Sequence, residues 1–99
     1  MLGGNNMIKQ TEMTKLATLL AKEDIPFEIV VWAIGEEPCL MIASPDADHR
    51  VVDAVCHQYS YGGKEGLIEV LGSANPNLPN DDAKGWMTAN EAFQYFTEM

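Results

Sequence analysis

The sequence has few basic residues, few cysteines and no long apolar run. Six Lys and Arg stand against fifteen Asp and Glu, which gives a formal net charge of −9 at pH 7. An acidic surface repels phosphates, so we do not expect direct binding to nucleic acid. Without an apolar stretch near the ~20 residues that cross a bilayer, we expect no membrane partner either. The charge suits a basic protein surface, or it simply keeps a small protein soluble.

The cysteines and the beginning of the chain limit the cellular setting. Cys39 and Cys56 are too few to define a disulfide framework, and both lie in apolar, strand-like segments. Two buried thiols in a reduced cytoplasm are therefore expected. Residues 1–10 lack the basic and apolar regions of a secretory signal, and we expect a flexible leader, with translation starting at Met1 or Met7. The predicted localisation is cytoplasmic.

The first half of the chain predicts a helix followed by two strands. Apolar residues recur at helical spacing over residues 11–23, with Thr11 as the expected N-cap. Pro26 ends this helix because it disfavours helical torsions in the residue before it. Residues 27–34 are rich in Val, Ile and Trp, which favours a strand with apolar side chains on both faces. A turn containing Gly and Pro then leads into an antiparallel strand over residues 39–44.

The second half of the chain gives less uniform signals for secondary structure. Residues 49–59 fit both a helical stripe and a strand, and their three valines favour the strand. We predict a short helix from Gly63 to Gly72, followed by a polar loop over residues 73–82 and a brief extended segment, "KGWM". Thr88 and Glu91 then form a capping box that begins a last helix.

Together these elements predict one α+β domain over residues 11–99. Hydrophobic residues make up 46% of the chain, as in an ordinary folded protein. The predicted order is helix-strand-strand-strand-helix-helix, with a three-stranded antiparallel sheet and the helices packed on one face.

The stretch "HQYSYGGK", which begins at His57, is the strongest candidate for a binding site. Paired glycines let backbone amides approach an anion, a helix start presents free N–H groups, and a lysine adds positive charge. The spacing matches neither a P-loop nor a dinucleotide fingerprint. The alternative is that the glycines only make a turn from a strand into a helix. The predicted ligand-binding residues are His57, Tyr59, Ser60, Tyr61, Gly62, Gly63 and Lys64.

The sequence gives less support to catalysis or metal binding. Cys56 and His57 are neighbours on a predicted strand and point to opposite faces, so they do not make a nucleophile and base pair. The Cys and His spacings match no metal site, and the paired carboxylates lie in predicted turns. We therefore predict no catalytic residue, no metal and no cofactor. Trp32 and Trp86 are either core residues or part of an interface in a homo-oligomer, and an exposed Trp86 would also suit the lining of a ligand pocket.

Two segments carry a resemblance to a known group of proteins. The segments "VVDAVCHQYSYGGKEGLIEVLGS" and "KGWMTANEAFQYF" resemble a pattern in small, uncharacterised phage and prophage proteins of Gram-positive bacteria. The resemblance implies a viral or mobile-element setting and action in the host cytoplasm, and it supplies no catalytic residue. Small accessory phage proteins often block host defences, and extending that role to this chain is an analogy.

The expected function is therefore non-enzymatic binding, by sequestration or blockade, most plausibly against a host defence system. In one version the chain binds a nucleotide-like, phosphorylated ligand at the glycine-rich loop. In a second version its acidic surface occupies a basic groove of a host enzyme, as a nucleic-acid mimic does. A small hydrolase that uses His57 with a turn carboxylate is a more distant alternative.

Overall fold

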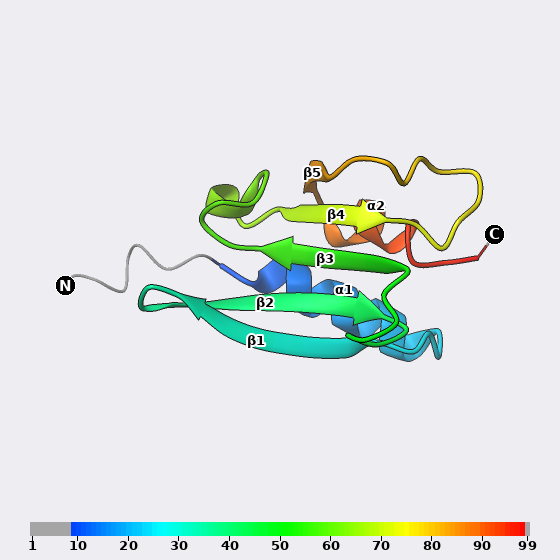
Figure 1. Cartoon of the computed structure of the whole chain (residues 1–99), viewed down its shortest axis with the longest axis horizontal. Helices are drawn as coiled ribbons and strands as arrows, with labels where there is room; N and C mark the ends of the chain where they lie inside the picture. The colour runs from blue at the N-terminus through cyan, green and yellow to red at the C-terminus, as the bar shows by residue number, and fades with distance from the viewer. Residues whose placement is uncertain (1–8, 99) are drawn as a thin grey trace.

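A computed structural model describes residues 9–98, which form a five-stranded antiparallel sheet with two helices on one face (Figure 1). The sheet order is β1-β2-β3-β4-β5, so every strand pairs with its neighbours in the sequence. The α+β class is confirmed, but the prediction of three strands was wrong. Most of the predicted leader, residues 1–8, lies outside the described residues. The elements are α1 (Thr11–Lys22), β1 (Glu28–Ile34), β2 (Glu37–Ser44), β3 (Val52–Cys56), the 3-10 turn η2 (Gly63–Glu65), β4 (Ile68–Gly72), β5 (Lys84–Met87) and α2 (Ala89–Phe93).

Helix α1 lies behind the sheet and supplies one side of the core. Its apolar stripe is confirmed, because Met13, Leu16 and Leu20 are buried against the sheet. The predicted cap is wrong: the N-cap is Gln10, which makes no side-chain cap and instead donates from Nε2 to the carbonyl of Cys56 at 3.0 Å. Gln10 thus ties the beginning of the helix to the end of β3.

No helix within residues 9–98 is long and apolar enough to cross a membrane.

Strands β2 and β3 form the centre of the sheet. The strand interpretation of residues 49–59 is confirmed, although β3 itself covers only Val52–Cys56. Its alternation places Val52, Ala54 and Cys56 on the helix side, where all three are buried. The core is completed by Ile42 and by further apolar side chains from β4 and both helices.

Strand β4 occupies the segment where we predicted a helix, and that prediction was wrong. Ile68 and Val70 alternate with Glu69 and are fully buried on the helix side, which is the period of a strand. Val70 pairs with Ala54 of β3. Gly72 does not cap a helix: its φ is +85°, and a Cβ there would lie 2.3 Å from the carbonyl oxygen of Val51. Close packing at the strand end explains this glycine.

The last two elements match their predictions. "KGWM" forms β5, at the edge of the sheet beside β4. Thr88 and Glu91 form both hydrogen bonds of the capping box at the start of α2. The apolar stripe of this segment is buried at Ala89, Ala92 and Phe96.

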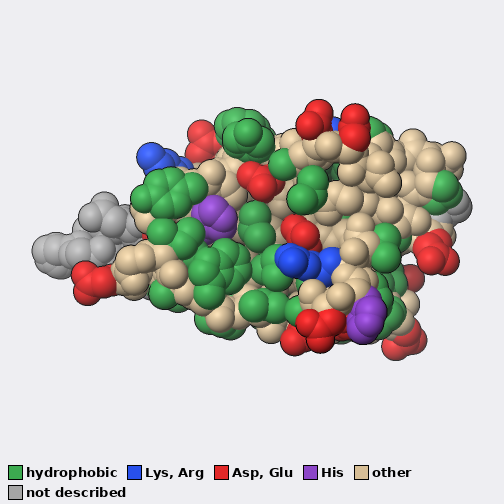
Figure 2. All heavy atoms as spheres, viewed as in Figure 1, with side chains coloured by type: hydrophobic (Ala, Val, Ile, Leu, Met, Phe, Trp, Pro, Cys, Tyr) green, Lys and Arg blue, Asp and Glu red, His purple; other side chains and the backbone are tan. Residues whose placement is uncertain are grey.

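No element of the described chain covers the other face of the sheet, which we call the open face (Figure 2). Figure 2 shows hydrophobic side chains gathered there around a histidine. Trp32 pairs with Cys39 in the β1–β2 register, and its ring meets the ring of His57 edge-on at 5.9 Å. Cys39 lies between Trp32 on β1 and the end of β3 that leads to His57, and it is fully buried on the open face.

Candidate functional site

The loop between β3 and β4 is held together by its own hydrogen bonds. Ser60 is its centre: the Oγ hydroxyl donates to the carbonyl of His57 at 2.8 Å and accepts from the amide of His57 at 2.9 Å. The Ser60 amide also donates to the His57 carbonyl, and the Gly63 amide donates to the Ser60 carbonyl, both at 3.0 Å. The sequence "HQYSYGG" therefore folds into consecutive turns.

Both glycines of the pair are needed by the loop itself. A Cβ on Gly63 would lie 1.8 Å from the His57 carbonyl oxygen and 2.4 Å from Ser60 Oγ. Gly62 has φ +88°, and a Cβ there would lie 2.8 Å from the backbone of Trp86. The helix expected after this pair is a single 3-10 turn of three residues, η2. These contacts favour the alternative explanation, in which the glycines shape a turn.

The seven predicted site residues do not all meet. A shallow hollow of about 240 Å³ lies over the loop. It is lined by Gln58, Ser60, Tyr61, Gly62, Lys64, Glu65 and Trp86. His57 lies outside the hollow, on the open face, with the ring of Tyr59 at 6.4 Å. Gly63 is buried beneath the loop.

Trp86 joins the loop from β5, a contact that the sequence did not reveal. Its amide donates to the Tyr61 carbonyl at 3.1 Å, and the two rings are stacked at 5.7 Å with an interplanar angle of 6°. Trp86 adopts φ +55°, a left-handed conformation that is rare for a bulky residue. Both tryptophans are partly exposed, so neither is a core residue. We define the aromatic patch as Tyr59, Tyr61 and Trp86, whose exposed fractions are 72%, 52% and 58%.

Charges around the aromatic patch are mixed. Lys64 is the one cation among residues 57–69, whereas Glu65 lines the hollow beside it. Glu69 accepts a hydrogen bond from the Tyr61 amide at 2.8 Å, so a second carboxylate is fixed at the loop. The loop itself therefore contributes one positive charge, whereas phosphate sites usually gather several.

Cys56 and His57, at the end of β3, do not form a reactive pair. Burial raises the pKa of Cys56 to about 11, so the thiol is protonated at neutral pH. Cys56 points into the core, whereas His57 lies on the open face, as predicted. Burial also raises the pKa of Cys39.

Within residues 9–98 there is no group of three His, Cys, Asp or Glu side chains placed to hold a metal ion.

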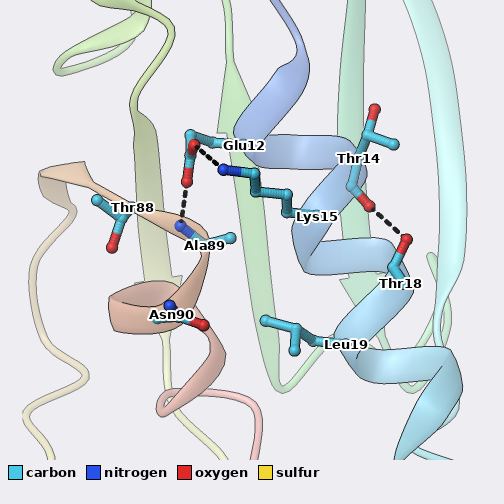
Figure 3. A pocket seen from close by; sticks show the side chains of 8 residues that line it. All are labelled: Glu12, Thr14, Lys15, Thr18, Leu19, Thr88, Ala89 and Asn90. Carbon is cyan, nitrogen blue, oxygen red and sulfur yellow. Dashed lines mark hydrogen bonds and ion pairs between the residues drawn. The ribbon is translucent and has the colours of Figure 1, made fainter.

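A second hollow lies between α1 and α2, and Figure 3 shows its lining. Its volume is about 460 Å³. At its upper end Glu12 accepts a hydrogen bond from the Ala89 amide at 2.8 Å, and Lys15 pairs with the same carboxylate at 3.3 Å (Figure 3). Glu12 thus satisfies one of the free N–H groups at the start of α2. We interpret this hollow as the junction of the two helices.

No protein-family model, curated protein or solved structure matches this chain. The resemblance to phage and prophage proteins therefore stays a prediction.

The Glu12 contact predicts a pH-dependent contribution to stability. The hydrogen bond from Ala89 is the main cause that lowers the pKa of Glu12 below its ordinary value of 4.5, and nearby Lys15 adds to it. A lowered pKa in the folded state stabilises the fold above the ordinary pKa, and this is lost as the pH falls through the folded value. We expect Glu12→Gln to reduce the free energy of unfolding by about 1 kcal/mol at pH 7 and by much less near pH 3.

Urea unfolding at both pH values measures this difference. Glu23→Gln is the matched control, because it removes the same charge from an exposed position just after the same helix. An equal loss at pH 7 and near pH 3 would contradict the role given to the Glu12 carboxylate.

Proposed function

We propose that this chain is a non-enzymatic binding protein that blocks a basic surface of a partner protein through its aromatic patch. The supporting observation is a stacked pair of exposed rings, Tyr61 of the β3–β4 loop and Trp86 of β5, with carboxylates beside them on an acidic domain. Solvent-exposed aromatic rings in such a group are typical of recognition surfaces.

The aromatic rings suit arginine and lysine side chains of a partner. A guanidinium or ammonium group over the face of Tyr or Trp is attracted by about 0.5–1 kcal/mol at exposed sites. Tyr61 and Trp86 are stacked with parallel planes, which leaves flat ring faces exposed. Glu65 lines the same hollow as Tyr61 and Trp86, and the Glu69 carboxylate accepts a hydrogen bond from the Tyr61 amide. The loop and the adjoining strands thus offer both kinds of contact that a basic segment needs.

The net charge supports the same class of partner. A charge of −9 on 99 residues attracts basic surfaces over long range and speeds their association. Such attraction weakens with salt, because the Debye length falls to about 8 Å at physiological ionic strength. Because a phage setting is predicted, the proposed partner is a cytoplasmic host protein with a basic groove, such as a defence enzyme that binds nucleic acid.

A second candidate function is the binding of a nucleotide-like ligand in the hollow. One observation favours it: Lys64, Ser60 and the exposed ring of Tyr61 line the same hollow. A base could stack on the ring while the lysine meets a phosphate. The hollow is smaller than the ~300 Å³ typical of ligand pockets, however, and Glu65 lines it as well. We therefore place this candidate second.

Reversal of one charge separates the two candidates. Lys64→Glu is expected to strengthen binding to a short arginine-rich peptide by a few fold and to abolish any binding of ATP. Tyr59→Ala and Tyr61→Ala leave the charge unchanged and should each weaken peptide binding roughly fivefold, because each removes ~1 kcal/mol of cation–π contact. Isothermal titration calorimetry at low and physiological salt measures these affinities.

The control is Leu71→Ala, which removes an exposed apolar side chain from β4 rather than from the aromatic patch. If peptide affinity responds equally to Leu71→Ala and Tyr61→Ala, the aromatic patch has no specific role in binding. If ATP binds and Lys64→Glu abolishes that binding, the second candidate takes the place of the first.

A further inference from the structure

The two edges of the sheet differ in how well they are protected against pairing with a strand of another chain. At one edge, β5 has only four residues, a shifted register between Ile68 and Val70, and a left-handed residue at Trp86. At the other edge, β1 has seven residues in unbroken register with β2. Short, irregular edge strands resist pairing with another chain, whereas long, regular ones invite it. The β1 edge is therefore the one open to a further strand.

After Glu28 at its beginning, the side chains of β1 do not discourage such pairing. Residues 29–34 contain no charged residue and no proline, the usual devices that blunt an edge. Ile29 and Val31 point to the helix side but remain 48% and 64% exposed. Trp32 lies on the open face and is also partly exposed. Apolar side chains are thus exposed on both faces of the same edge strand.

The backbone of β1 offers an unpaired row of hydrogen-bonding groups. β1 and β2 are joined by the two-residue turn at Gly35 and Glu36, with Ile34 opposite Glu37. In such hairpins the residues that flank the turn form the hydrogen-bonded pair, and the pattern alternates along the strand. Every second residue, Val31 among them, therefore turns its N–H and C=O groups away from β2.

We propose that the strand that pairs with this edge is β1 of a second copy of this chain, which gives a two-fold, continuous sheet of ten strands. An antiparallel pair centred on Val31 places Val31 opposite its own copy. Val30 then falls opposite Trp32 of the other chain, and the same pair recurs on the other side of the two-fold axis. Aromatic and β-branched residues form favourable cross-strand pairs. Self-complementarity of this kind is what an isologous interface requires.

Charge opposes association of two copies elsewhere and makes this edge the least unfavourable place for it. Two chains that each carry −9 repel one another across most of their surfaces. In the pairing centred on Val31, Glu28 falls opposite Ile34 of the other chain, so no carboxylate lies opposite another along the strand pair. This inference is independent of the proposed function, since the strand pairing uses residues of β1, whereas the aromatic patch lies on the β3–β4 loop and on β5. It also gives the predicted homo-oligomer a definite geometry that includes Trp32 and excludes Trp86.

The expected affinity of this dimer follows from the small area that a single strand pair buries. Seven residues span about 23 Å, and one such pair buries less than the ~800 Å² per partner of a standard interface. We therefore expect a dimer that dissociates on dilution, in the micromolar range, rather than a permanent one.

Sedimentation velocity over a dilution series tests the proposal. Val31→Lys places an edge-protecting lysine at the centre of the strand and should shift the dimer dissociation constant upward by at least tenfold. Val51→Lys is the matched control: the same substitution at another exposed valine, 53% exposed and outside β1, should leave dimerisation unchanged. Circular dichroism checks that both variants keep the fold.

Leu71→Lys distinguishes edge pairing from stacking of two open faces, because Leu71 is an exposed residue of β4 on the open face. Dissociation by Leu71→Lys but not by Val31→Lys would overturn the proposal in favour of face-to-face association. A protein that stays monomeric at several hundred micromolar would overturn it as well and would leave the edge to a strand of a different partner. Symmetric disulfide formation in Val31→Cys, absent in Val51→Cys, would support the central register.

Discussion

Gly63→Ala is expected to destabilise the domain by about 3 kcal/mol or more, a large part of the stability of a chain this size. The added methyl group would lie 1.8 Å from the His57 carbonyl oxygen, which is backbone and has no room to move without opening the loop. The same movement would break the hydrogen bonds between Ser60 and His57. Urea unfolding followed by circular dichroism measures the loss.

Gly35→Ala is the matched control for this substitution. Gly35 has φ +63°, but nothing lies within 4 Å of the position of a Cβ. Its replacement should therefore cost only the strain of a left-handed alanine, about 1 kcal/mol. If the two variants lose the same stability, the close packing of Gly63 does not hold the loop, and an open, ligand-accepting loop becomes the better description.

The second large effect is expected in the core. Leu16→Ala should lower the free energy of unfolding by about 3 kcal/mol, because Leu16 is fully buried between α1 and the sheet and its removal leaves a cavity. Leu19→Ala, on the half-buried side of the same helix, should lower it by only about 1 kcal/mol. Thermal and urea unfolding of both variants test this ratio. Equal losses would mean that α1 packs on the sheet through a different face.

The elements that the sequence predicted correctly are those with strong local signals. The stripe that includes Met13 and Leu16 has helical spacing over three turns, and Thr88 with Glu91 defines the start of α2 without any tertiary contact. The valines of β3 also decide correctly between helix and strand. In each case the local preference and the packed core agree.

Strand β4 was missed because its signal depends on a partner. A five-residue apolar segment between glycines fits a buried strand and a short helix equally well by periodicity. Pairing of Val70 with Ala54 decides between them, and that pairing is a tertiary fact. The glycines that suggested helix ends instead serve close backbone contacts, as at Gly72.

The candidate site was predicted in part for the same reason. Ser60, Tyr61 and Lys64 are neighbours in sequence and meet at the hollow. Trp86 meets them only because β5 returns beside β4, and nothing in the local sequence connects it to Tyr61. His57 leaves the group because strand alternation turns it onto the open face.

The contact between α1 and α2 ties the beginning of the described chain to its end. Glu12 and Ala89 are 77 residues apart, and both helices cover the same side of the sheet. Removal of either helix would uncover core residues that the other helix also helps to bury. Folding of this domain should therefore be all-or-none, and neither end can be shortened into its helix to yield a stable smaller fragment.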